Sequence, residues 1–278
     1  MAECRVCYRH CNIKEGAYGF CGVRTCKDGQ IVPENYGMLT SIALDPIEKK
    51  PLQRFMPGSN ILSVGSYGCN LRCPFCQNYE ISWSKEVEFI KKQARFVSPE
   101  ELVHIACEQK INGNIGVAFT YNEPLISYEY ALDTAKLLRK NGLKTVLVTN
   151  GMADVNVVGE LFEFVDAMNI DLKGFTDYYY QDILKGNRQM VMSLIEEAVK
   201  HCHVELTTLV VPRENDTDKE IEELSRWIAS LRNDIPLHLS RFFPRFKMTD
   251  REATPVEQVY HLKDIAKEHL KYVYTGNC

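Results

Sequence analysis

Three cysteines with close spacing are the residues of this sequence best suited to carry chemistry. Cys69, Cys73 and Cys76 have the spacing C-x3-C-x2-C, and no fourth cysteine completes the set within the same run. Cubane iron–sulfur clusters normally take four cysteine thiolates. Three ligands therefore leave one iron open, and an open coordination position is typical of a reactive metal site. The alternatives are a zinc knuckle or three buried thiols, and this spacing is unusual for zinc.

A second set of cysteines lies near the N-terminus. It consists of Cys4, Cys7, Cys11 and Cys21, with Cys26 as a spare. Four thiolates in a short segment would stabilise it as structural metal sites do. Zinc and a second iron–sulfur cluster both fit this pattern, so both stay open. Unligated thiols fit it least, because the segment has too little apolar content to fold unaided.

The bulk composition limits the class of protein. A chain of 278 residues with 45% hydrophobic residues suits one large domain with a small appendage. The net charge of -4 and the absence of a long basic run predict no nucleic-acid partner. No signal peptide and no membrane-spanning run can be recognised. Eleven cysteines then indicate metal ligation in a reducing compartment, so we expect a cytoplasmic, oxygen-sensitive protein with no membrane partner.

Short apolar runs alternate with amphipathic segments from about residue 60 onward, which predicts parallel βαβ units. The predicted strands are Asn60–Tyr67, Ile115–Thr120, Lys144–Thr149, Asp166–Asp171, Val204–Val211, Pro236–Ser240 and Tyr272–Thr275. The first predicted helix begins at Ser98 and ends near Gly113. The other predicted helices are Ser127–Asn141, Val155–Phe164, Met190–His201, Asp218–Leu231 and Val256–Leu270.

Polar residues follow nearly every predicted strand, and their positions favour a barrel. The cysteine loop follows the first strand, Glu123 the second, Asn150 the third, Asp171 and Lys173 the fourth. Functional groups at the carboxyl ends of many strands are typical of (β/α) barrels, whereas an open sheet gathers them at one switch point. We therefore predict an α/β fold with a partial or full (β/α) barrel at 56–278 and a cysteine-rich module at 1–55.

Several longer motifs resemble one known family. They are Gly19-Phe-Cys-Gly-Val-Arg24, Cys73-Pro-Phe-Cys-Gln-Asn78, Thr120-Tyr-Asn-Glu-Pro124, Asn169-Ile-Asp-Leu-Lys173 and His238-Leu-Ser-Arg-Phe-Phe-Pro244. Together with the cysteine loop they resemble the radical-SAM superfamily, in its pyruvate formate-lyase activating-enzyme branch. Within that branch the likeness is greatest to the radical-SAM proteins of the AmmeMemoRadiSam system. Only Glu-Pro is shared with the Gly-Gly-Glu-Pro segment that is usual in the family.

The resemblance implies two cofactors and a set of residues that hold them. Cys69, Cys73 and Cys76 would bind a [4Fe-4S] cluster, and Glu123 would accept a hydrogen bond from the methionine ammonium group of S-adenosylmethionine (SAM). Without the resemblance, Glu123 is equally consistent with an ordinary strand-to-helix turn. The residues that we predict to bind the SAM cofactor are Phe75, Asn122, Glu123, Asn150, Asp171, Lys173, His238 and Arg241.

The implied activity is that of a radical-SAM oxidoreductase. The reduced cluster would cleave SAM to a 5′-deoxyadenosyl radical, which abstracts hydrogen from a glycine of a partner enzyme or from a small molecule. A flavodoxin- or ferredoxin-type protein would supply the electron. Two other classes stay open, an iron–sulfur electron-transfer or scaffold protein and a zinc-ribbon interaction protein. Neither of them explains the polar residues at successive strand ends.

Overall fold

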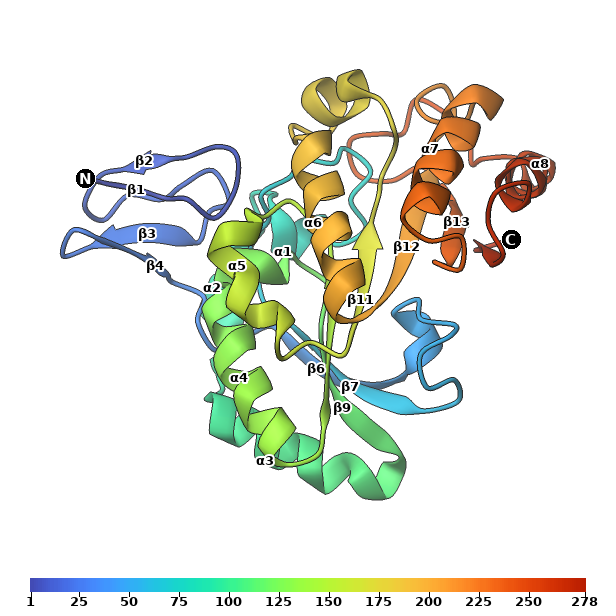
Figure 1. Ribbon diagram of the computed structural model, residues 1–278. Helices are drawn as coiled ribbons and strands as arrows, with labels where there is room; N and C mark the ends of the chain where they lie inside the picture. The colour runs from blue at the N-terminus through green and yellow to red at the C-terminus, as the bar shows by residue number, and fades with distance from the viewer.

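The centre of the molecule is an eight-stranded sheet, in a computed structural model that describes residues 1–278 (Figure 1). Its strand order is β14-β13-β12-β11-β10-β9-β7-β6, and every strand except β6 runs parallel to its neighbours. Because β14 and β6 do not pair with each other, the barrel is partial. The strands of this sheet are β6 (Ser41–Pro46), β7 (Asn60–Gly65), β9 (Asn114–Phe119), β10 (Lys144–Thr149), β11 (Ala167–Asp171), β12 (His203–Val210), β13 (Leu237–Arg241) and β14 (Val273–Gly276).

Helices alternate with the parallel strands and cover the outside of the sheet (Figure 1). They are α1 (Tyr79–Ser82), α2 (Val87–Gln93), α3 (Pro99–Glu108), α4 (Tyr128–Lys140), α5 (Val155–Phe162), α6 (Arg188–His201), α7 (Asp218–Leu231) and α8 (Val256–Lys267). Side chains that accept backbone N–H bonds fix the start of four of them: Ser98, Asp154, Asn187 and Thr217. The predicted α/β partial barrel is thereby confirmed. No helix is both long enough and apolar enough to cross a lipid bilayer.

A short segment between β6 and β7 closes the amino-terminal end of the barrel. Ile47 and Leu52 pack there against buried residues of the strands, Ile61, Val146 and Ala167 among them. The buried carboxylate of Glu205 on β12 accepts the N–H groups of Gln53 and Arg54 at 3.0 and 2.7 Å. We refer to residues 47–55 as the plug. The chemistry of the barrel is therefore confined to its other end.

The N-terminal residues form short hairpins beside the sheet (Figure 1). The hairpin strands are β1 (Ala2–Glu3), β2 (Asn12–Ile13), β3 (Arg24–Lys27) and β4 (Gln30–Pro33). A further two-stranded sheet consists of β5 (Met38–Leu39) and β8 (Arg95–Phe96). Val6 accepts the N–H of Asp154 at 2.8 Å, and the Tyr8 hydroxyl donates to the Lys185 carbonyl at 3.0 Å. The hairpins are thus held against the ends of α5 and α6. Strand β6, from the segment assigned to the predicted module, instead pairs with β7; the boundary at residue 55 stays a prediction.

Candidate active site

A cavity of about 660 Å³ opens at the carboxyl ends of the parallel strands. The end of nearly every strand contributes to its wall, from the loop after β7 to Asn277 after β14. The predicted site residues that the structure brings together here are Cys69, Cys73, Phe75, Cys76, Asn122, Glu123, Asn150, Asp171, Lys173 and Arg241. Ten residues from distant parts of the sequence therefore share one wall, although their individual roles stay predictions.

The three loop cysteines are held by the chain around them. The Sγ atom of Cys69 accepts the Leu71 N–H at 3.4 Å and an Asn150 side-chain N–H at 3.6 Å. Burial raises the pKa of Cys73 to about 12 and also raises the pKa values of Cys69 and Cys76. Metal binding requires the thiolates, so a cationic metal centre has to offset this cost. Hydrogen bonds to the sulfur ligands of a cluster also tune its reduction potential.

No group of three or more His, Cys, Asp or Glu side chains has the spacing of ligands to one metal ion. In a cubane cluster each cysteine binds a different iron, so its thiolates do not meet at one ion. The three thiols on one cavity wall, with N–H donors directed at Cys69, fit such a cluster.

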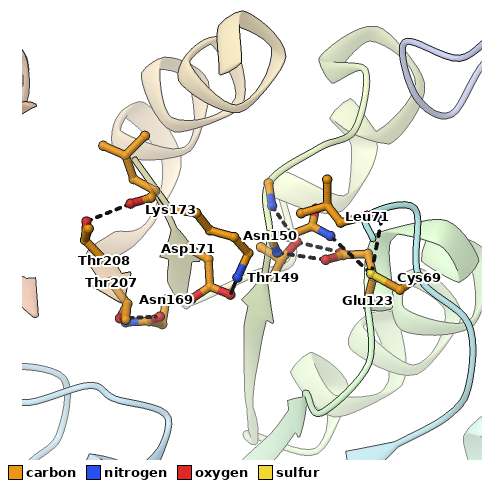
Figure 2. A network of polar contacts seen from close by, with 12 residues as sticks. Cys69, Leu71, Glu123, Thr149, Asn150, Asn169, Asp171, Lys173, Thr207 and Thr208 are labelled. Atoms are coloured by element: carbon orange, nitrogen blue, oxygen red, sulfur yellow. Dashed lines mark hydrogen bonds and ion pairs between the residues drawn. The ribbon is translucent and has the colours of Figure 1, made fainter. Parts of the chain in front are cut away.

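Glu123 is the centre of a hydrogen-bond network beside the cysteine loop (Figure 2). Its carboxylate accepts the Thr149 hydroxyl at 2.6 Å, the Asn150 N–H at 2.7 Å and the Leu125 N–H at 2.9 Å. Burial raises the pKa of Glu123 to about 7, although these three donors lower it. Asn150 connects the network to Cys69, so the ends of β9 and β10 and the cysteine loop are positioned as one unit.

Asp171 and Lys173 form an ion pair at the carboxyl end of β11 (Figure 2). The Lys173 Nζ lies 2.9 Å from an Asp171 carboxylate oxygen. Burial lowers the pKa of Lys173, but Asp171 and Cys73 outweigh it and hold that pKa above its ordinary value. The ammonium group therefore stays charged and places a cation next to the cysteine loop.

Three other predicted residues lie on the cavity wall, and each is held there by a contact with a neighbouring part of the chain. Asn122 accepts the Ser66 N–H at 2.9 Å and donates to the Tyr67 carbonyl at 3.1 Å, which fixes the backbone that enters the cysteine loop. Phe75 packs edge-to-face against Phe242. Arg241 donates its Nε–H to the Thr254 carbonyl at 2.7 Å and has no carboxylate partner.

His238 is the one predicted cofactor-binding residue that does not line the cavity. Its Nε2 lies 2.6 Å from the Glu205 carboxylate, which the plug also contacts. The side chain belongs to the buried layer near the closed end of the barrel. The alternation of side chains along the strand predicted that His238 lies on the same face as Ser240. It did not predict how far from the open end of the barrel His238 lies, because this depends on the contact with Glu205, which is distant in the sequence.

Several residues of the cavity wall were not anticipated. Lys50, Tyr121 and Arg245 all line the cavity. The Asp45 carboxylate accepts the Lys50 ammonium and the Tyr121 hydroxyl, both at 2.9 Å, and so joins the end of β6 to the loop after β9. Lys50 lies within the run Asp45–Pro51, whose sequence indicates a connection between two parts of the chain. The one available signal was Tyr121, which lies inside the Tyr-Asn-Glu-Pro motif.

The N-terminal cysteines gather in a separate small cavity. Cys4, Cys7, Cys11 and Cys21 all line it, whereas Cys26 lies outside and donates to Glu15 at 3.4 Å. Burial raises the pKa of Cys7 to about 11, and the neighbouring thiols Cys21, Cys4 and Cys11 add to this. The structure thus brings the four predicted ligands together; that they hold zinc or an iron–sulfur cluster stays a prediction.

The comparisons with known proteins assign this site to a family. Residues 63–228 match the Radical SAM superfamily, and the chain belongs to that superfamily. An uncharacterized protein of Methanocaldococcus jannaschii is 39% identical over 99% of this chain and 81% of its own length. The pyruvate formate-lyase-activating enzyme of Clostridium pasteurianum is 27% identical over 73% of this chain and 89% of its own. The activating-enzyme branch is therefore supported as well.

The solved structures agree with the fold. The crystal structure of Streptococcus suis SuiB superposes with a TM-score of 0.60 at 13% identity over 84% of this chain. The chain spans about half of that protein, 52% of its length, and the likeness concerns the fold alone. SuiB has also been solved bound to SAM. Membership of the superfamily assigns a [4Fe-4S] cluster and SAM to this protein as its cofactors.

Proposed function

We propose that this protein is an activating enzyme that abstracts a hydrogen atom from a glycine of a partner enzyme and leaves a glycyl radical there. One observation carries the proposal: the cysteine loop, the Glu123 network and the Asp171–Lys173 pair line a single cavity at the mouth of an open barrel. The 27% identity to a pyruvate formate-lyase-activating enzyme supports this choice of substrate.

The chain itself has to bind, orient and exclude water. The bound cluster and SAM supply one electron and a 5′-deoxyadenosyl radical. Cys69, Cys73 and Cys76 hold the cluster, and the Glu123 carboxylate accepts the ammonium group of SAM. The plug closes the amino-terminal end of the barrel, so substrate enters at the carboxyl ends of the strands. The electron comes from a flavodoxin- or ferredoxin-type protein.

The first experiment measures SAM cleavage. Anaerobically reconstituted protein, given SAM and a strong one-electron reductant, should form 5′-deoxyadenosine. The triple variant Cys69→Ala, Cys73→Ala, Cys76→Ala should lose this product together with the absorbance of the loop cluster, whereas Cys107→Ala on α3 should retain both. Absence of 5′-deoxyadenosine from the wild-type protein contradicts the proposal.

The second experiment identifies the substrate class. An anaerobic pull-down from the native cell, treated with SAM and reductant, should show the EPR doublet of a glycyl radical. A small molecule with an anionic group is the second candidate, because Arg241 and Arg245 line the cavity without carboxylate partners. New small-molecule products without the doublet select that candidate. A cluster signal that SAM does not change selects an electron-transfer protein.

A further inference from the structure

Two arginines at the cavity of the N-terminal cysteines each have a buried Nε–H group without an acceptor. Arg9 and Arg24 line this cavity together with Cys4, Cys7, Cys11 and Cys21. Arg24 is 3% exposed; its terminal nitrogens bind Glu129 at 2.7 and 2.9 Å, but its Nε–H has no acceptor, and neither does the Nε–H of Arg9. Leaving a buried donor without an acceptor is unfavourable, because it has lost its hydrogen bond to water. An anionic metal–thiolate centre would provide acceptors for both.

This cavity is joined directly to the radical-SAM loop. The N–H of Cys69 donates to the carbonyl of Cys21 at 3.3 Å, so a ligand residue of one site is hydrogen-bonded to a ligand residue of the other. The approach depends on Gly68, whose φ of +89° is unfavourable for other residues. A Cβ at this position would lie 2.5 Å from Val23 Cγ1 and 3.0 Å from the Cys21 carbonyl oxygen.

Arg72 forms a second connection between the two sites. Its guanidinium donates to the Cys69 carbonyl at 2.8 Å and also to the carbonyl of Phe20, the neighbour of Cys21. It lies 3.8 Å from the centroid of the Phe20 ring, and Arg9 lies 3.4 Å from the same centroid. One half-buried cation therefore contacts the backbone of both cysteine segments.

We propose that Cys4, Cys7, Cys11 and Cys21 hold a redox-active iron–sulfur cluster that relays one electron to the cluster of the radical-SAM loop. The relay rests on the proposed function, since it feeds SAM cleavage. The flavodoxin- or ferredoxin-type donor is oxidised by one electron, the relay cluster is reduced and then reoxidised, and the loop cluster is reduced. No covalent bond changes in the relay itself.

The connection distinguishes a relay from a purely structural metal. Zinc has no redox chemistry, and a zinc site that only stabilises the hairpins needs no contact with the catalytic loop. Here the contact is made by Cys21 itself and by a shared cation. Positive charge near a cluster favours its reduced form, because reduction adds negative charge. Arg72 is therefore placed to adjust both clusters together.

The first test isolates the relay site. The full chain with Cys69, Cys73 and Cys76 replaced by Ala, purified anaerobically, should retain iron and sulfide and show an EPR signal after reduction. Zinc in place of iron, or no metal at these cysteines, overturns the proposal. This outcome does not depend on SAM chemistry.

The second test follows the electron. In Cys7→Ser, reduction of the loop cluster by a reduced flavodoxin should be largely lost, because the relay cluster lacks one of its four thiolate ligands. Cys26→Ser, in the same hairpins but outside the cavity, is the matched control and should keep the wild-type rate. Equal rates in all three proteins overturn the relay.

A small, strong reductant separates this proposal from the proposed function. It reduces the loop cluster directly, so Cys7→Ser should then still form 5′-deoxyadenosine. If the wild-type protein also forms none, the proposed function has failed, and the relay is then decided by the iron content of the triple-alanine protein and by the rate of loop-cluster reduction. Arg72→Met gives a further readout by redox titration: both midpoint potentials should fall, and about 59 mV corresponds to each tenfold change for one electron. Unchanged potentials contradict a shared cation.

Discussion

Glu123 combines two conditions that oppose each other. Burial favours the neutral carboxyl group and raises its pKa to about 7, whereas three donors favour the carboxylate. A cationic ligand group such as an ammonium would decide in favour of the carboxylate. Glu123 has no ion-pair partner on the cavity wall, so a bound cationic group would find a buried acceptor there.

The first prediction concerns the charge of Glu123. Glu123→Gln keeps the shape but loses the negative charge and places an amide where the Asn150 or Thr149 donor needs an acceptor. We expect the Kd for SAM to rise roughly tenfold or more, about 1.4 kcal/mol, measured by anaerobic calorimetry. Glu220→Gln is the control, since this buried carboxylate binds the Phe175 N–H outside the cavity. Unchanged SAM affinity in Glu123→Gln contradicts the assigned role.

The place of the loop cysteines on the cavity wall could be predicted from their identity and spacing, and that of Glu123 from its position after a predicted strand together with the resemblance. Lys50 could not, because its place in the cavity depends on Asp45 and on the pairing of β6 with β7. His238 had the right residue type on the right strand, but Glu205 holds it near the closed end. Spacing thus indicates which residues are candidates, and long-range contacts determine which of them reach the site.

At the scale of the elements, the plug is attached to the barrel by one buried carboxylate. Burial alone would raise the pKa of Glu205, but donors from His203, His238, Gln53 and Arg54 outweigh it and lower the pKa to about 2. Because the folded value lies below the ordinary 4.5, the ionised group stabilises the fold above pH 4.5. This stabilisation disappears as the pH falls from 4.5 toward 2.

The second prediction follows from that sign. Glu205→Gln should lower the free energy of unfolding by ~3 kcal/mol at neutral pH, the energy that corresponds to the difference between 4.5 and about 2. Its stability should then fall less steeply than that of wild type below pH 4.5. Urea titrations of metal-free proteins measure both quantities. Glu222→Gln, on the exposed face of α7, serves as control, and parallel pH profiles of Glu205→Gln and wild type contradict the prediction.

The third prediction concerns the link between β6 and the cavity. The side chain of Lys50 is 3% exposed and depends on Asp45 for its counter-charge. Asp45→Ala leaves this ammonium unpaired, which should cost about 3–5 kcal/mol in the free energy of unfolding. The double variant Asp45→Ala, Lys50→Met removes the unpaired charge and should recover most of the loss. If thermal or urea unfolding shows additive losses instead, the pair is not coupled.

The parallel elements could be predicted more easily than the edge of the sheet. Strand β10 is buried on both faces, and its centre reads as the continuous apolar run Val146–Val148. Strand β6 has no buried residue, contains only the three apolar residues Ile42–Leu44 and ends in Asp45-Pro46. Its place is decided by the neighbouring β7 and by the plug, so only the folded chain identifies it as part of the sheet.

For the whole molecule, we infer a division of stability between the barrel, which has its own core, and the N-terminal hairpins, whose folding the proposed relay centre would also support. The barrel has a large hydrophobic core of its own, whereas the hairpins and their connections bury five apolar residues, Cys4, Val6, Ile13, Val23 and Cys26. Two of these five are thiols, and Cys4 lines the proposed metal cavity. A metal centre at that cavity must therefore contribute much of the folding energy of the N-terminal hairpins.

The fourth prediction is that metal removal acts locally. After chelation under anaerobic conditions, amide hydrogen exchange should accelerate over β1–β4, because their small core cannot compensate for the lost ligands. Exchange in β10, β11 and β12 should stay close to that of the metal-loaded protein, since these strands lie in the main core. Cys7→Ser should reproduce the pattern without chelator, and Cys26→Ser should not. Acceleration throughout the sheet, or none in the hairpins, contradicts the division. A confined response shows that the hairpins fold around their metal while docked on an independently stable barrel.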